Sequence, residues 1–158
     1  NDNHIQGTIG SKVNLGLYYS DDLVSIMTFG KGRVVMNGVK NEWELLRFCN
    51  KINHSVTGGA SKLFKHFIKM YNPKEIISYA DRRWSIGNIF NLLGFNFIEN
   101  TQPNWFIINN KKREHRVKYQ KHKLVNMGYC KNKTAHQICL DNGLYRIYDC
   151  GTKKYIYG

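Results

Sequence analysis

Residues 81–84 place a carboxylate, two guanidinium groups and an indole in four consecutive positions. They follow an apolar run that is typical of a strand, residues 76–79, and they precede a short amphipathic helix that ends at Gly94. In open α/β sheets, ligands bind beyond the carboxyl ends of the strands. Each side chain also has a structural alternative, because Asp81 can cap the helix, the two arginines can be solvated and Trp84 can pack. Together, on a basic chain, the four residues predict a functional surface.

A second candidate site is the segment 111–124, which holds seven Lys or Arg residues and one Glu. Val117 and Leu124 lie seven positions apart, so the segment is predicted to form a helix with a narrow packing seam and a broad cationic face. Such a face neutralises DNA phosphates, with an affinity that falls steeply as salt rises. The alternative is a solvated helix of a lysine-rich protein, but exposed helices usually mix charges of both signs. The predicted DNA-binding residues are Arg82, Arg83, Lys111, Lys112, Arg113, Arg116, Lys118, Lys121 and Lys123, and His115, Tyr119 and Gln120 are candidates for base or sugar contacts.

The composition is that of a folded and strongly basic protein. Of the 158 residues, 42% are hydrophobic and 13% are aromatic, which excludes a disordered chain, and the formal net charge is +13. A surplus of this size favours a polyanionic partner, nucleic acid first and an anionic membrane second. No apolar run reaches the roughly 18 residues that a membrane span needs. The first residues are polar, so no signal peptide is expected.

The four cysteines form no CxxC pair. A chain of this size buries enough core to do without disulfides, so we expect reduced cysteines and a cytoplasmic location. Cys130, His136, Cys139 and Cys150 offer zinc-ligand chemistry, but their spacing matches no common zinc finger, and no metal site is predicted.

The hydrophobic pattern predicts a mixed α/β core in residues 1–110. An antiparallel meander opens it, with a hairpin turn at residues 20–22 and a further turn at residues 37–38. Apolar residues at helical spacing then predict a helix after a glycine-rich turn, and a second helix follows the next strand. The predicted strands are 13–19, 23–29, 34–36, 43–49, 76–79, 95–98 and 105–108, and the two predicted helices have their apolar positions within 63–71 and 86–93.

Residues 111–158 are predicted to extend this core with the basic helix, a short second helix and a terminal hairpin. Thr134 is a favourable N-cap for the second helix, which is expected to end before Asn142 and Gly143. The hairpin is expected to pair residues 145–148 with residues 154–157.

The turn Gly58-Gly59-Ala60 stands at the start of a predicted helix, where backbone N–H groups and the helix dipole favour a phosphate. Its alternative is a tight turn that allows close packing. The layout around it resembles the GNAT acetyltransferase superfamily, in which a strand leads to a glycine-rich turn that grips the pyrophosphate of acetyl-CoA. This resemblance implies a GNAT-like mixed sheet flanked by helices and a donor site at Gly58, Gly59, Ala60, Ser61 and Lys62.

Two departures from the GNAT pattern concern its chemistry. Superfamily members usually carry Arg or Gln three residues before the first glycine of the turn, where this chain has Ser55. They usually carry Tyr in a later Tyr-x-x-x-Gly-Phe signature, where this chain has Phe90 followed by Gly94 and Phe95. That tyrosine protonates the departing thiolate of CoA, and Phe90 has no proton to give. The resemblance therefore supports the fold more than acetyl transfer.

A longer set of motifs covers nearly the whole chain. FGK, EWELLRFCNK, GGASKLFK, ISYADRRWS, LGF and LYRIYDCG resemble the carboxyl-terminal portion of phage proteins known as Hef-like homing endonucleases, which belong to mobile elements. In those proteins a nuclease domain similar to very-short-patch-repair nucleases comes first, and a segment like NHIQG, here residues 3–7, joins it to this portion. The resemblance implies double-stranded DNA as partner, a nuclease domain left off this chain, and the cytoplasm of a phage-infected bacterium.

Two functions therefore remain open. The first is the DNA-binding, target-recognition portion of a phage-type homing endonuclease, without a cofactor. The second is a GNAT-type transferase that uses acetyl-CoA or a related donor. One form of it is an enzyme that modifies DNA bases, or an inactive relative of one, with Asp81 as the catalytic base or the residue that orients the target amine and Arg82 or Arg83 holding phosphate or an anionic intermediate. A donor groove open between the central strands would favour the transferase.

Overall fold

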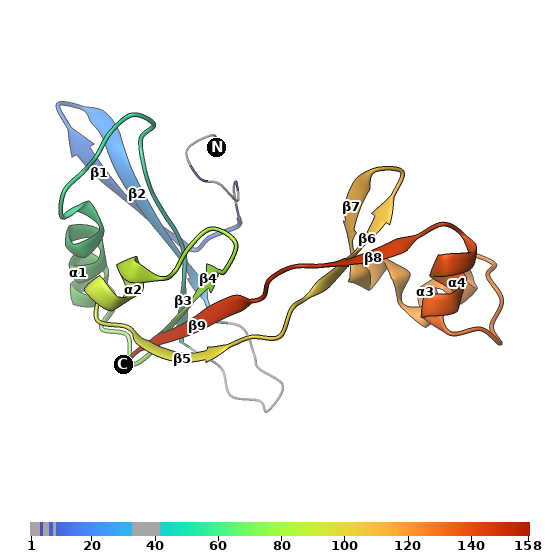
Figure 1. The fold of residues 1–158 in the computed structure, drawn as a ribbon. Coiled ribbons are helices and arrows are strands. Elements are labelled where there is room, and N and C mark those ends of the chain that lie inside the picture. Colours follow the sequence, from blue (N-terminus) through green and yellow to red (C-terminus); the bar gives the residue numbers. More distant parts are fainter. Residues whose placement is uncertain (1–3, 5–6, 8, 33–41) are drawn as a thin grey trace. The chain divides into compact units, whose positions relative to one another are not determined.

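The computed structural model describes residues 4, 7, 9–32 and 42–158. Over these residues the chain is a mixed α/β protein with a six-stranded mixed sheet, a three-stranded antiparallel sheet and four short α-helices (Figure 1). It divides into two compact units, which we call unit 1 (Asn1–Thr101 with Thr152–Gly158) and unit 2 (Gln102–Gly151). The predicted strand at 34–36, the turn at 37–38 and most of the segment 3–7 lie outside the described residues.

Unit 1 begins with the predicted antiparallel meander. Strands β1 (Val13–Tyr19), β2 (Asp22–Lys31) and β3 (Trp43–Asn50) pair in chain order. The hairpin between β1 and β2 turns through Ser20 and Asp21, whose φ angles of 45° and 67° give the mirror-image turn that matches the twist of paired strands. The two strands and their hairpin are therefore confirmed.

The strand pairing changes from antiparallel to parallel in the centre of the sheet. Helix α1 (Gly59–Tyr71) connects β3 to β4 (Ile76–Asp81), and β4 runs parallel to β3. The two strands pair only at Trp43 with Ile76 and at Glu44 with Ile77. Beyond these two pairs the backbone pairing of β3 with β4 stops, and the Ser78 hydroxyl of β4 donates to the Leu45 carbonyl oxygen of β3, so the sheet opens between its central strands after Leu45.

The last strands of unit 1 correct one prediction. Helix α2 (Asn88–Leu92) leads to β5 (Asn96–Asn100), and β9 (Thr152–Tyr157) lies between β4 and β5, giving the order β1-β2-β3-β4-β9-β5. The predicted terminal hairpin of residues 145–148 with 154–157 is wrong, because β9 pairs with β4 and β5 instead. Tyr155 and Tyr157 fill the core of unit 1, which fixes β9 there.

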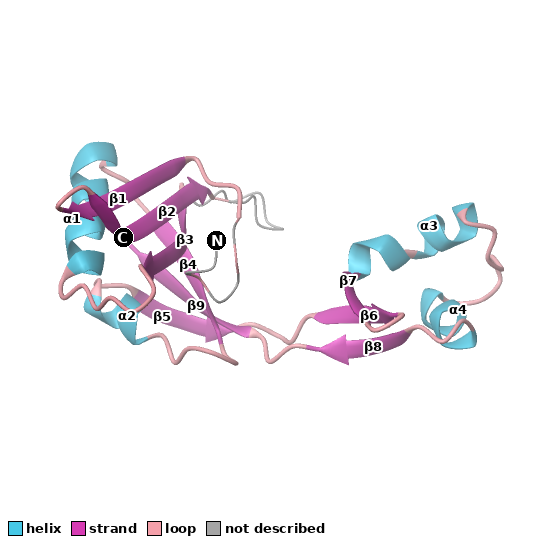
Figure 2. Ribbon diagram, turned by 90° about the horizontal axis from the view of Figure 1, so that it is seen from above, coloured by secondary structure: helices cyan, strands magenta, loops and turns pink. Residues whose placement is uncertain are grey.

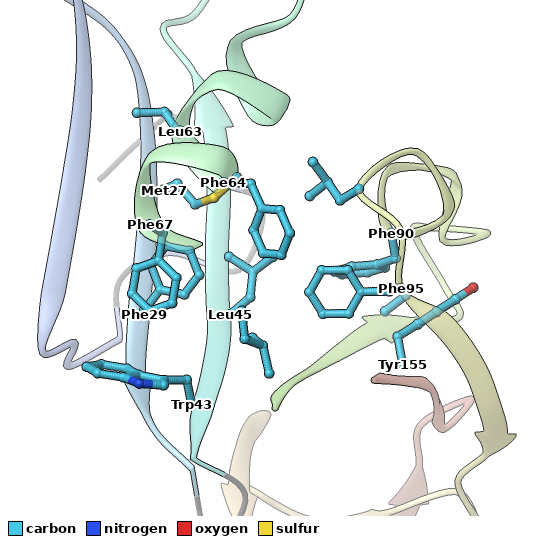
Figure 3. Packing of buried hydrophobic residues seen from close by; sticks show 13 residues of the cluster. Met27, Phe29, Trp43, Leu45, Leu63, Phe64, Phe67, Phe90, Phe95 and Tyr155 are labelled. Atoms are coloured by element: carbon cyan, nitrogen blue, oxygen red, sulfur yellow. The ribbon is translucent and has the colours of Figure 1, made fainter. Parts of the chain in front are cut away.

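Helices α1 and α2 contribute to one core cluster against the six-stranded sheet (Figure 2). Its centre is aromatic. Figure 3 shows Phe67 of α1 lying on Phe29 of β2, with ring centroids 3.5 Å apart, and Trp43 meeting Phe67 edge-on at 5.2 Å. Phe90 of α2 stacks on Tyr155 of β9 at 4.8 Å. The contacts of Trp43 with Phe67 and of Phe90 with Tyr155 have centroid distances at which aromatic pairs stabilise a core beyond simple area burial.

Unit 2 is inserted in the chain between β5 and β9. Strands β6 (Trp105–Asn109), β7 (Lys112–His115) and β8 (Tyr145–Tyr148) form its sheet in the order β7-β6-β8. A 3-10 helix, η1 (Arg116–Tyr119), and helices α3 (Lys121–Asn126) and α4 (Ala135–Asp141) complete it. Strand β6, predicted as part of the 1–110 core, therefore belongs to the same compact unit as the basic segment.

The predicted basic helix over 111–124 is wrong. Asn110 and Lys111 have φ angles of 46° and 65° and form the two-residue turn of a β6–β7 hairpin, so the first basic residues belong to a strand. His115 then caps η1 by accepting from the Val117 N–H, and the extended backbone of Gln120 separates η1 from α3. His115 therefore lies at the boundary between β7 and η1, and Gln120 lies at the boundary between η1 and α3.

The short helix α4 confirms the prediction for the end of unit 2. The Thr134 side chain accepts from the Gln137 N–H, and the Gln137 side chain accepts from the Thr134 N–H. This reciprocal capping box satisfies two donors at the helix start. The helix places Ile138 and Cys139 in the core of unit 2, together with Ile107, Tyr119 and Leu124.

Candidate nucleic-acid interface and candidate donor groove

Unit 2 carries more than half of the net positive charge of the chain. Its 50 residues hold ten Lys or Arg residues and three Asp or Glu residues, a net +7, against +6 for the 108 residues of unit 1. This concentration makes unit 2 the first place to look for a polyanion contact.

All three carboxylates of unit 2 have partners within the unit. Glu114 accepts from the Tyr119 hydroxyl and pairs with Lys118 at 3.4 Å, and Asp141 pairs with Lys133 at 2.7 Å. Asp149 accepts from the backbone N–H groups of Asn104 and Gly151. Only two of the ten cations are therefore paired. The eight that form no ion pair with any residue the structure describes are Lys111, Lys112, Arg113, Arg116, Lys121, Lys123, Lys131 and Arg146.

The predicted DNA-binding residues of unit 2 are spread over four elements rather than one helix face. Lys111 stands at the tip of the β6–β7 hairpin. Neighbours along β7 point to opposite faces of the sheet, so Lys112 and Arg113 diverge. The remaining predicted cations follow on η1 (Arg116, Lys118) and α3 (Lys121, Lys123). Lys123 is half-buried, and the other six are exposed.

Hydrogen bonding at Glu114 shifts two pKa values in opposite directions. The hydrogen bond from Tyr119, with a smaller contribution from Lys118, lowers the pKa of the Glu114 carboxyl below its usual range. Burial, followed by the bond to the Glu114 carboxylate, raises the pKa of the Tyr119 hydroxyl. At neutral pH the pair is therefore an ionised carboxylate and a neutral phenol, which fixes η1 to β7.

Two aromatic–cation contacts were missed by sequence reasoning. The Arg146 guanidinium of β8 lies over the Trp105 ring of β6, 4.4 Å from its centroid, and the Arg113 guanidinium of β7 lies over the Phe106 ring at 4.5 Å. The signal was present as basic and aromatic residues in neighbouring strands, but the pairing of β6 with β8 joins residues about 40 positions apart in the chain. A pattern of neighbouring residues in the sequence cannot indicate a strand pairing over this distance in the chain.

In unit 1, the stretch 81–84 forms a turn after β4. The Arg83 side chain donates to both carboxylate oxygens of Asp81, at 3.1 and 2.6 Å, and the Arg83 backbone N–H donates to the same carboxylate. The Asp81 side chain is only 13% exposed. Arg82 is exposed, and Trp84 is 60% exposed. These hydrogen bonds between Asp81 and Arg83 hold the turn in place, so they give Asp81 a structural role.

A cavity of about 250 Å³ lies where β3 and β4 separate. Aromatic side chains from β3, β4, the following turn and α2 line it, among them Phe48, Tyr79, Trp84 and Phe90. Its polar groups include Arg47, Asp81 and His4. Burial, with a smaller contribution from the Arg47 charge, lowers the pKa of the His4 imidazole, so His4 is neutral at pH 7. The groove between the central strands is thus open, which is the feature that favours the transferase alternative.

The glycine-rich turn does not line this cavity. Gly58 has a φ of 72° and serves as the N-cap of α1, with open space around it. Gly59 is buried, and a Cβ there would lie 3.0 Å from Val56 and 3.2 Å from the Ser25 hydroxyl oxygen. Ala60 and Ser61 are half-buried, and Lys62 is exposed. Close packing therefore accounts for Gly59.

The remaining signals concern metals and membranes. Among the described residues, no three His, Cys, Asp or Glu side chains lie together as a metal site would require, so Cys130, His136, Cys139 and Cys150 form no such group. Cys139 is buried in the core of unit 2. Within the described ranges no helix has the length and apolar character to cross a membrane.

Comparison of the chain with protein-family models and with curated proteins gave no match.

Proposed function

We propose that this chain is a DNA-binding, target-recognition portion of a phage-type homing endonuclease and that unit 2 supplies the main DNA contact. The observation that carries the proposal is the eight cations of unit 2 that form no ion pair within the described part of the chain, set against three carboxylates that all have partners inside the unit. Cations whose charge is not neutralised by a carboxylate can replace the counterions of DNA phosphates. In unit 1, Arg82 is exposed at the turn after β4 and is a further cation predicted to bind DNA.

The resemblance to Hef-like homing endonucleases supports the same conclusion, because it implies double-stranded DNA as partner. In this proposal the nuclease chemistry belongs to a separate domain that such proteins carry before this portion. The GNAT-like arrangement of unit 1, with α1 and α2 on a mixed sheet whose central strands separate, then serves as the scaffold that carries unit 2 between β5 and β9.

The test is duplex-DNA binding by a charge-reversal variant. Replacing Arg113, Arg116 and Lys121 with Glu removes three phosphate contacts and should lower affinity about 100-fold or more at 0.15 M salt, and it should flatten the salt dependence by about three units of slope. The matched control replaces Lys12, Lys65 and Lys74 of unit 1, which are exposed, with Glu. Equal losses in both variants would mean that net charge, rather than unit 2, determines binding.

The open groove supports a second candidate, a GNAT-type transferase with acetyl-CoA or a related donor. The cavity lies between β3 and β4, where such a donor would enter the sheet, and Arg47 supplies a cation for an anionic group. Two features count against catalysis, because Phe90 has no proton to give and Asp81 is paired with Arg83. Titration with acetyl-CoA, in the absence and presence of DNA, separates the candidates. Saturable binding that is lost in Ala80→Trp, which fills the cavity, would favour the transferase.

A further inference from the structure

One face of the unit 2 sheet is not covered by the helices of the unit. The register places side chains of all three strands on it, since Phe106 lies opposite His115 and Ile147, and Ile108 lies opposite Arg113 and Tyr145. We call this set the open sheet face: Phe106, Ile108, Arg113, His115, Tyr145 and Ile147.

The helices of unit 2 pack against the other face of the sheet. Ile107, between Phe106 and Ile108, points the opposite way and is fully buried in the cluster formed with η1, α3 and α4. None of the six residues of the open sheet face belongs to that cluster. Tyr145 is 60% exposed and Ile147 is 39% exposed, so large side chains stand in solvent on this face. Packing in the core of unit 2 therefore does not explain why these large side chains are present on this face.

The chemistry of the face is cationic and apolar. Glu114, the carboxylate of β7, lies on the covered face with Tyr119, so no acidic side chain of the three strands shares the face with Arg113. The Phe106 ring supports the Arg113 guanidinium at 4.5 Å and meets the His115 ring edge-on at 5.9 Å. Stacking on an aromatic ring holds a guanidinium in place and leaves its N–H donors at the edge available.

We propose that the open sheet face enters the major groove of duplex DNA and reads its sequence. This inference rests on the proposed DNA-binding function and assigns base recognition to the open sheet face, which shares Arg113 with the predicted phosphate-binding cations. Neighbouring strands lie about 5 Å apart, so the β6–β7 ribbon fits a major groove about 12 Å wide. Its five-residue strand β6 spans about 17 Å, the length of roughly five base-pair steps.

Each part of the face has a match in the groove. Arg113 has the paired donors that recognise the O6 and N7 atoms of guanine, and Ile108 and Ile147 suit the methyl group of thymine. The unpaired cations at the hairpin tip and on η1, Lys111 and Arg116, are placed next to the ribbon and reach the flanking phosphates. Base edges supply specificity in this arrangement, and phosphates supply affinity.

The experiment selects bound sequences from a library of random duplexes with the full chain, then repeats the selection with two variants. Arg113→Gln with Ile147→Thr alters the open sheet face, and Lys118→Gln with Lys121→Gln alters only the helical side. The expected result is a motif of four or five base pairs that is relaxed, at about tenfold or greater loss of preference, only in the face variant. Methylation protection of guanine N7, which lies in the major groove, should mark the motif.

Four outcomes would overturn the inference. A motif unchanged in the face variant, no enriched motif at all, protection confined to adenine N3 in the minor groove, or preference for a single strand in competition would each exclude major-groove reading by this face. An unchanged motif or minor-groove protection would leave the proposed function standing, whereas the absence of any motif or a single-strand preference would also overturn its target-recognition part. Loss of all DNA binding by the unaltered chain would instead overturn both. Circular dichroism of each variant confirms that the sheet is retained.

Discussion

The Tyr119 hydroxyl donates a hydrogen bond to the Glu114 carboxylate and thereby joins the 3-10 helix η1 to strand β7. Glu114 is one of only three carboxylates in unit 2, and Lys118 is held to it as well. The hydrogen bond therefore stabilises the unit. The ion pair gives Lys118, one of the ten cations, a carboxylate partner inside the unit.

Replacing Glu114 with Gln should bring the pKa of Tyr119 down toward its ordinary value, because the carboxylate is one of the causes that raise it. Titration of ring-labelled tyrosines by NMR measures this directly. Asp141→Asn is the matched control, since it removes a second carboxylate of unit 2 that pairs with Lys133 rather than Tyr119. A Tyr119 pKa that moves equally in both variants would show that general charge, not the hydrogen bond, is responsible.

The same contact predicts the direction of an acid effect on stability. The pKa of Glu114 is lower in the folded chain than in the unfolded chain, so its contribution is fully present above the unfolded value near pH 4.5 and is lost as pH falls through the lower folded value. Glu114→Gln has no such group. The stability difference between the original chain and the variant should therefore shrink below about pH 4.5, as measured by urea unfolding at successive pH values. A difference that grows on acidification would contradict the assigned direction.

The capping box of α4 gives a local prediction. Thr134→Ala removes the side-chain acceptor for the Gln137 N–H and should destabilise the helix by about 1 kcal/mol. Amide hydrogen exchange in α4 should speed up accordingly, most at the first turn. Thr57→Ala, in an exposed turn outside the unit, is the control and should leave α4 unchanged. Unchanged exchange in Thr134→Ala would mean that packing of Ile138 and Cys139 alone holds the helix.

Local signals explain which elements could be predicted. Ser20 and Asp21 between two apolar runs, Thr134 with Gln137, and the helical spacing of Leu63 and Phe67 each act within a few residues, and all three elements are present. The prediction of a helix over the basic segment was wrong because it relied on the charge pattern and overlooked Asn110, a residue type that tolerates the positive φ of a hairpin turn.

Long-range pairing explains the rest. Strands β8 and β9 are separated by only a few residues, yet one pairs with β6 and the other with β4 and β5. In the sequence, two apolar runs separated by a short segment resemble a hairpin. Here they belong to different sheets, because unit 2 is inserted in the chain between β5 and β9. For the same reason, the contact of Arg146 with Trp105 and the cavity between β3 and β4 could not be predicted from neighbouring positions.

Phe67 anchors the core of unit 1, and its truncation should be costly. The side chain is fully buried and contacts the rings of Phe29, Trp43 and Tyr71. Phe67→Ala should therefore lower the free energy of unfolding by about 3–5 kcal/mol. Phe97→Ala, which removes a half-exposed ring, should cost clearly less in the same chemical unfolding experiment. Similar losses in the two variants would show that the ring stack is not the centre of stability.

Gly87 is confined both by its backbone and by a neighbour. Its φ is 92°, and a Cβ there would lie 2.0 Å from the Tyr155 hydroxyl oxygen and 2.6 Å from the ring carbon that bears it. Gly87→Ala should therefore unfold unit 1 more readily than Gly58→Ala, because Gly58 has a similar φ of 72° but open space around it. Strain is common to both variants, so the difference in thermal unfolding isolates the clash. Adding Tyr155→Phe should restore only part of the loss, since the ring carbon still obstructs the methyl group. Equal destabilisation by the two glycine variants would leave backbone strain as the whole cause and would mean that Tyr155 can move away from α2.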